Sequence, residues 1–284
     1  MESIRIGGNE NKLEVKNIID RYFLDSKVEI KEKDFTNRFE FEFSLEKKKH
    51  LDEIVFYNNL SNLVQDIIIE IYINVIVKDR VAKICSDYSI SEKQDIVTFV
   101  HKTLMDTNNY IKERITMNDE ICDYLMEHNS LLVDGYIRFR LRDYLYVIDI
   151  SIEKAILNLE TEKEYMEFLN MLHYFVDVQE PKYELVNVIV RDEDYLILDM
   201  DNNIIEDGLL NDMENELIYE EINKTDLLIS SLIVISPNQL IIHIKEVEKE
   251  QQLIEIISEI FRDRVSYCQG CEKCQVNIKL KKGK

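Results

Sequence analysis

Three cysteines near the end of the chain have the spacing of ligands for a soft metal ion. Cys268, Cys271 and Cys274 form two overlapping Cys-x-x-Cys pairs, and a tight turn at this spacing can point several sulfurs at one ion. Gly270 lies inside the first pair and gives such a turn backbone freedom. Thiolates are favoured ligands of zinc and of iron–sulfur clusters. The spacing therefore predicts a metal centre at Cys268, Cys271 and Cys274.

A structural zinc site has four ligands, and this cluster provides three. The candidates for the fourth are His243, Cys85 and Cys122. A bacterial ferredoxin run places a further cysteine four residues after the third, where this chain has Ile278. The sequence therefore does not match the ferredoxin pattern, although an iron–sulfur cluster held by three cysteines stays an open alternative. Two readings need no metal: a redox pair with Cys-x-x-Cys geometry, or thiols without a role.

The cysteines follow the last element of a predicted strand–helix–strand unit. Residues 240–244 and 265–267 have the composition of strands, and the apolar spacing over 253–260 predicts a helix between them. Such a connection makes the two strands parallel, so that their carboxyl ends lie at one edge of the sheet. His243 lies near the carboxyl end of the first strand, which places it on the same edge as the cysteines.

The remaining periodicity predicts an α/β or α+β fold with four parts. Residues 1–50 form a small α/β segment, 51–180 a helical region, 181–274 an α/β module with a mixed sheet, and 275–284 a basic tail without fixed structure. Within the helical region, residues 67–77 favour a buried helix, and their β-branched side chains leave a strand as the alternative.

Composition excludes several familiar classes of site. The 284 residues include only six glycines, and no window has the pattern of a P-loop, a dinucleotide fingerprint or a nucleophile elbow. The sequence indicates no catalytic residue and favours a non-enzymatic role. The net charge of −21 disfavours binding to nucleic-acid backbones, whereas a protein partner stays open. We expect no signal peptide and no membrane span, and hence a cytoplasmic protein with reduced thiols.

Two other groups of residues could do chemistry. Arg138, Arg140 and Arg142 alternate with aromatic residues, which suits nucleic-acid or phosphate contacts, but we expect a solvated face paired with the abundant carboxylates. His173 and Asp177 have the spacing of neighbours on a helix, and we expect ordinary surface polarity there rather than a shared metal.

Three stretches of the chain resemble the YtxC-like family: DGYIRFRLRDY (134–144), EYMEFLNMLHYFVDVQEP (164–181) and IFRDRVSYCQGCEKC (260–274). The resemblance covers the middle and C-terminal thirds. It implies a cytoplasmic protein of endospore-forming bacteria that is associated with sporulation. It implies no established activity, so no catalytic residue is carried over.

The leading hypothesis is a sporulation-associated protein without enzymatic activity, whose C-terminal cysteines bind zinc for structure or interaction. One alternative is an iron–sulfur or Cys-x-x-Cys redox protein. The other is an adaptor that binds no metal and whose acidic surface meets a basic partner.

Overall fold

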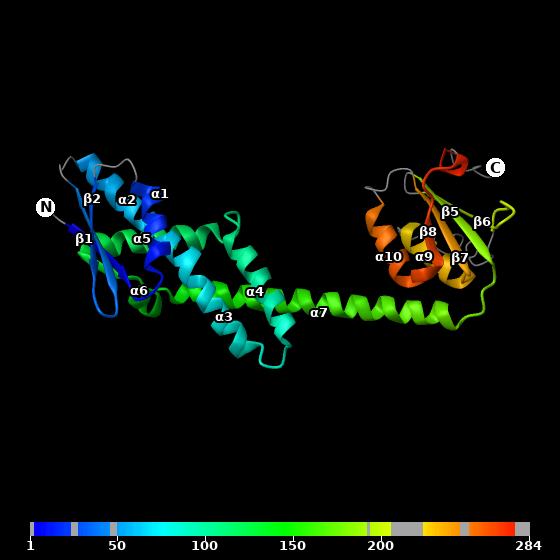
Figure 1. Cartoon of the computed structure of the whole chain (residues 1–284), viewed down its shortest axis with the longest axis horizontal. Helices are drawn as coiled ribbons and strands as arrows, with labels where there is room; N and C mark the ends of the chain where they lie inside the picture. Colours follow the sequence, from blue (N-terminus) through cyan, green and yellow to red (C-terminus); the bar gives the residue numbers. More distant parts are fainter. Residues whose placement is uncertain are drawn as a thin grey trace. The chain divides into compact units, whose positions relative to one another are not determined.

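The computed structural model describes residues 3–23, 28–45, 50–191, 194–205, 224–244 and 250–275. Contacts between residues divide the chain into two compact units, Met1–Thr161 (unit 1) and Glu162–Lys284 (unit 2). Each unit has its own hydrophobic core and its own four-stranded sheet (Figure 1). The predicted fold class is confirmed: a small α/β segment, a helical middle and a C-terminal mixed sheet.

The sheet of unit 1 combines antiparallel and parallel pairing. It contains β1 (Ser3–Gly8), β2 (Val28–Asp34), β3 (Phe39–Leu45) and β4 (Ser130–Leu132), in the order β2-β3-β1-β4. The pairs β1/β3 and β2/β3 are antiparallel, and β1/β4 is parallel. The short β4 was not predicted, because three residues are too few to display a period of two.

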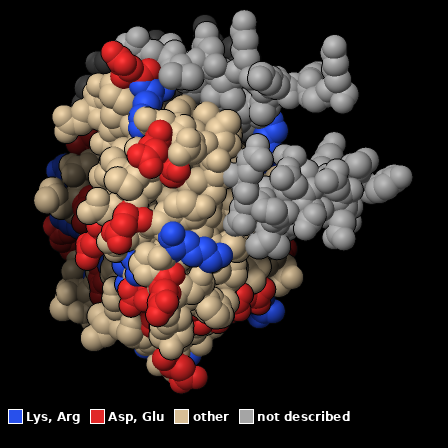
Figure 2. Space-filling view, turned by 90° about the vertical axis from the view of Figure 1, so that its right-hand side faces the viewer, with Lys and Arg blue, Asp and Glu red and all other residues tan. Residues whose placement is uncertain are grey.

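The surface carries the acidic excess of the chain. Figure 2 shows aspartate and glutamate side chains spread over one face of the molecule, with lysine and arginine side chains between them. This distribution agrees with the net charge of −21.

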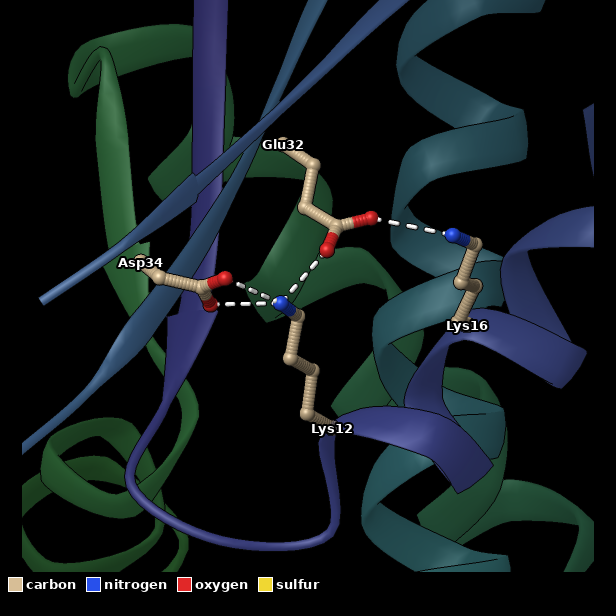
Figure 3. A network of polar contacts seen from close by, with 4 residues as sticks. All are labelled: Lys12, Lys16, Glu32 and Asp34. Carbon is tan, nitrogen blue, oxygen red and sulfur yellow. Dashed lines mark hydrogen bonds and ion pairs between the residues drawn. The ribbon is translucent and has the colours of Figure 1, made fainter.

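Ion pairs join α1 (Lys12–Phe23) to β2 in unit 1 (Figure 3). The Nζ atom of Lys12 lies 2.5 Å from carboxylate oxygens of both Glu32 and Asp34, and Lys16 contacts Glu32 at 3.0 Å. Exposed pairs of this kind are screened by solvent and contribute little to stability. The network therefore positions the helix and adds little to the stability of the fold, which depends on the apolar core.

Besides α1, the described part of unit 1 contains seven helical segments. The apolar residues 67–77 lie within helix and not in a strand, because side chains on several faces are buried. A capping box formed by Ser89 and Glu92 begins the helix α4. The segments are α2 (His50–Ile67), the π-helical turn η1 (Ile68–Tyr72), α3 (Ile73–Ile84), α4 (Ile90–Met105), α5 (Ile111–Glu127), α6 (Val133–Arg140) and the first part of α7 (Arg142–Val178).

One helical stretch, Glu53–Ile84, is long and apolar enough to cross a membrane by length and composition alone. The apolar run identified in the sequence, residues 67–77, is only part of this stretch. In the structure α2, η1 and α3 follow one another end to end and form one longer helical stretch. The most apolar window of this stretch is 61% buried inside the protein. It is therefore a core helix, and no membrane span is indicated among the described residues.

The sheet of unit 2 has the order β6-β5-β7-β8. The strand β5 (Leu185–Arg191) pairs antiparallel with β6 (Asp194–Leu198). The predicted strand–helix–strand unit is confirmed, with β7 (Gln239–Ile244) parallel to β8 (Val265–Tyr267) and α10 (Gln251–Phe261) between them. The end of α7 and the helix α9 (Lys224–Ile235) contribute to the same core.

The expected basic tail, 275–284, lies outside the described residues except for Gln275. The predicted boundaries at residues 50 and 180 describe segments that differ in composition. Whether these segments are separate domains stays a prediction, since the two compact units meet at Thr161 and Glu162, inside α7.

Candidate metal centre

The sheet of unit 2 brings His243 and Cys268 to one edge. His243 is the second-last residue of β7, and Cys268 directly follows β8. Because the two strands are parallel, their carboxyl ends coincide, and the backbone N–H of Cys268 continues the ladder by donating to the carbonyl of Ile242 at 2.9 Å. The position of Cys268 is thus fixed by the backbone of the sheet.

A turn then returns the chain to His243. Gly270 has a φ of +119°, a backbone conformation that residues other than glycine rarely adopt. The 3₁₀-helical turn η4 (Glu272–Gln275) follows, and the N–H of Cys274 donates to the carbonyl of Cys271 at 3.1 Å. This reversal points the Cys271 and Cys274 sulfurs at the same imidazole.

The four predicted side chains come together. One ligand atom from each of His243, Cys268, Cys271 and Cys274 lies within 4.8 Å of all the others. The Nδ1 atom of His243 is 3.3 Å from the Cys271 sulfur and 3.6 Å from the Cys274 sulfur, and these sulfurs are 3.9 Å apart. That the four residues ligate a metal stays a prediction.

These separations are close to those that a tetrahedral zinc ion imposes on its ligands. With Zn–S near 2.3 Å and Zn–N near 2.0–2.1 Å, tetrahedral angles give S···S of about 3.8 Å and S···N of about 3.6 Å. The three measured distances scatter around these values. These three side chains could therefore share a single ion with little movement, and the Cys268 ligand atom lies within 4.8 Å of each of theirs.

The buried Asn187 orients the imidazole of His243. The Nε2 atom of His243 lies 3.1 Å from Oδ1 of Asn187, and Nδ2 of Asn187 donates to the carbonyl of Asp199 at 3.4 Å. With the amide in this orientation, Nε2 carries the proton and Nδ1 presents its lone pair to the cysteines. Sequence reasoning missed Asn187, although a polar residue inside the apolar strand Leu-Val-Asn-Val-Ile-Val was a usable signal.

The local environment favours the protonation states that a metal needs. Burial, together with the nearby Lys273, lowers the pKa of His243, which keeps the imidazole neutral. A hydrogen bond from the N–H of Cys274 lowers the pKa of the Cys271 thiol, which favours the thiolate. For Cys268, the N–H of Gly270 acts in the same direction, but the neighbouring thiols and burial raise the pKa overall.

The other candidate ligands lie elsewhere among the described residues. Cys85 is fully buried in the core of unit 1 and Cys122 packs at its margin, and burial raises the pKa of both thiols. His173 and Asp177 take different partners, the carbonyl of Ile260 at 2.8 Å and Arg264 at 3.2 Å. Each of the two residues therefore has a polar partner of its own.

The arginine segment differs from expectation. Within the ranges that the structure describes, Arg138, Arg140 and Arg142 are exposed and make no ion pair with a carboxylate. Arg140 instead lies over the ring of Tyr124, at 5.5 Å from the centroid. The three residues flank Leu141, where the backbone leaves the helical conformation between α6 and α7.

Comparison with known proteins identifies the family of this chain. No curated protein and no solved structure matches it. The model of the YtxC-like family matches residues 58–266, which include His243 and all of β7 and end at Ser266, inside β8 and two residues before Cys268. Since this match covers most of the chain and agrees with the resemblance in its middle and C-terminal thirds, the protein belongs to the YtxC-like family.

Proposed function

We propose that Cys268, Cys271, Cys274 and His243 bind one structural zinc ion, in a cytoplasmic, sporulation-associated protein that is not an enzyme. The observation that carries the proposal is the mutual spacing of the four ligand atoms, all within 4.8 Å. Three thiolates and one imidazole are a standard ligand set of closed structural zinc sites.

The spacing favours a single ion over the two alternatives. An iron–sulfur cluster holds its cysteines around several iron atoms, whereas the ligand atoms of this group all lie within 4.8 Å of one another, which favours a single ion. A Cys-x-x-Cys redox pair needs two thiols, and it leaves the third cysteine and the neutral, oriented His243 without a role.

A structural role follows from the position of the site on the sheet. The edge strand β8 has three residues, none of them fully buried. Hydrophobic burial therefore anchors this strand weakly, and the segment from Cys268 to Gln275 beyond it packs few apolar side chains. A zinc ion shared by His243 and the three cysteines would join this segment covalently to the neighbouring strand β7.

The cellular setting is proposed from the family. Membership in the YtxC-like family suggests a link to sporulation, and the reducing cytoplasm would keep the three thiols free to bind metal.

Metal content tests the proposal. Protein purified without oxygen is analysed for zinc and iron beside Cys271→Ser and, as a matched control, Cys122→Ser, which changes a thiol in unit 1. We expect about one zinc per chain in the wild type and the control, and a loss of most zinc from Cys271→Ser. Iron with visible absorbance in place of zinc, or equal zinc in all three proteins, contradicts the proposal. So does the absence of metal after growth with added zinc.

A further inference from the structure

The helix α7 carries an apolar stripe on one side of its C-terminal half. Phe168, Met171, Phe175 and Val178 succeed one another at intervals of three, four and three residues, which places them on one face of the helix. The first three are each about half exposed, and Val178 is 57% exposed. We call these four residues the α7 stripe. Tyr174, 64% exposed, borders it.

Another side of the same helix segment attaches it to unit 2. Leu169 and Val176 are buried in the core of this unit, and His173 bonds to the carbonyl of Ile260 at 2.8 Å. Asn170 and Asp177 bond to Arg262 and Arg264. The α7 stripe therefore takes no part in holding the helix on the sheet of its own unit, so its large apolar side chains call for another explanation.

The spacing of the α7 stripe is that of a seam between two helices. Alternating intervals of three and four residues keep apolar side chains on the line along which a second helix packs. An extended peptide places every second side chain on the same face, and this period of two does not match the spacing of the α7 stripe. The geometry thus favours a helix as the occupant.

The charge beside the stripe favours a basic occupant. Glu164 continues the stripe four residues before Phe168, and Glu167 lies next to it. Among the described residues, neither carboxylate has a hydrogen bond or an ion pair in the structure. Between residues 160 and 180 the chain contains several acidic residues but a single lysine, Lys163. The whole chain carries a net charge of −21. Lysine or arginine on a partner would compensate this charge.

A second copy of the chain suits this surface poorly. In a parallel pair of α7 helices, Glu164 and Glu167 of the two copies would meet each other. In an antiparallel pair, residues 164–178 of the other copy offer no lysine or arginine to these carboxylates, so the carboxylates would be desolvated without a partner. Both arrangements also bring together two chains of charge −21.

We propose that the α7 stripe, with Glu164 and Glu167, binds an amphipathic helix of a partner protein. The apolar side of that helix packs on Phe168, Met171, Phe175 and Val178, and its basic residues pair with the two glutamates. This interaction surface is independent of the proposed zinc site.

A designed peptide tests the surface on the full-length protein. The probe is a fluorescently labelled helical peptide with leucines at alternating three- and four-residue spacing and flanking lysines. Two control peptides carry glutamates in place of the lysines, or the same composition in scrambled order. The protein variants are Phe168→Ser/Phe175→Ser and Glu164→Gln/Glu167→Gln. Their controls change exposed residues elsewhere: Leu13→Ser/Ile90→Ser and Glu14→Gln/Glu113→Gln.

We expect the lysine peptide to bind by fluorescence anisotropy and to bind more tightly than both control peptides. Removing the two phenylalanines should weaken its binding about tenfold or more, as for residues at the centre of an interface. The glutamine pair should weaken it several-fold and reduce its dependence on salt, and the control variants should bind as the wild type does.

Several results would overturn the proposal. These are no binding of the lysine peptide, equal binding of the scrambled peptide, or equal effects of the test and control variants. A dimer of the wild type that Phe168→Ser/Phe175→Ser dissolves would assign the surface to a second copy instead.

Discussion

Asn187 and His243 lie on the neighbouring parallel strands β5 and β7, and their side chains meet at 3.1 Å. Both are buried, with exposed fractions of 3% and 4%. The contact fixes which nitrogen of the imidazole faces the cysteines. The proposed zinc centre therefore depends on Asn187, a residue of the sheet of unit 2 that is not one of the proposed ligands.

Replacing Asn187 should weaken zinc binding without removing a ligand. In Asn187→Ala the imidazole loses the acceptor that holds Nε2, so the affinity for zinc should fall about 10- to 100-fold, as for other partners of metal ligands. Competition with a chromophoric chelator measures it. Asn238→Ala, which removes an exposed amide bonded to Glu184 at 3.1 Å, is the control. Equal affinities in both variants would show that Asn187 does not orient His243.

The thiols should differ in reactivity when metal is removed. Cys271 has a lowered pKa because the N–H of Cys274 bonds to its sulfur, whereas burial raises the pKa of Cys85 and Cys122. Thiolates are the reactive species, so iodoacetamide should modify Cys271 first among these three near neutral pH. Peptide mapping by mass spectrometry follows the reaction, and zinc should protect Cys271. Faster labelling of Cys122, or no protection by zinc, would contradict the assignment.

Acid should destabilise the metal-free protein through His243. Its pKa is lowered in the folded state from 6.5, because burial and Lys273 disfavour the charged imidazole. A group of this kind contributes stability that is complete above its unfolded pKa and is lost as the pH falls through the folded pKa. The free energy of unfolding in chelator should therefore decrease below about pH 6.5.

This pH dependence has a direct control. His243→Gln should show a smaller decrease in unfolding free energy over the acidic range than the wild type. Thermal unfolding at a series of pH values measures both. An unchanged pH dependence in His243→Gln would mean that this imidazole is not the responsible group.

Two glycine substitutions should change stability in opposite directions. Gly270→Ala meets no atom within 4 Å, but its φ of +119° is strained for alanine, so it should cost about 1–3 kcal/mol and weaken zinc binding. Gly135 lies in α6, where an added Cβ meets only Leu132 at 4.0 Å, so Gly135→Ala should stabilise the protein by about 0.5–1 kcal/mol. Denaturant unfolding tests both, and a Gly270→Ala variant as stable as the wild type would contradict the account of the turn.

The sequence alone showed the three cysteines of the proposed metal centre, but it gave only indirect evidence for His243 and Asn187. The spacing of Cys268, Cys271 and Cys274 was visible directly, and the strand–helix–strand pattern was enough to bring His243 to the same edge. Asn187 could not be paired with His243 beforehand, because that contact depends on which strands are neighbours in the sheet. Cys85 and Cys122 stayed candidates in the sequence for the same reason.

The limits of prediction in unit 1 have similar causes. The prediction of a helical region over residues 51–180 gave no sign of the interruption at Leu141, which the structure places between α6 and α7. Likewise, the composition suggested carboxylate partners for Arg138, Arg140 and Arg142. Among the described residues none of the three pairs with a carboxylate, whereas Arg80 pairs with Asp149. Both features depend on packing between elements, which periodicity does not record.

X-ray absorption at the zinc edge tests the central claim most directly, because it reports the ligands and their distances together. The purified full-length protein should show three sulfur neighbours at about 2.3 Å and one nitrogen neighbour at about 2.0–2.1 Å. His243→Ala should lose the nitrogen contribution and keep the three sulfurs. A shell of nitrogen and oxygen neighbours without sulfur, or an unchanged spectrum in His243→Ala, would contradict the assignment of this centre.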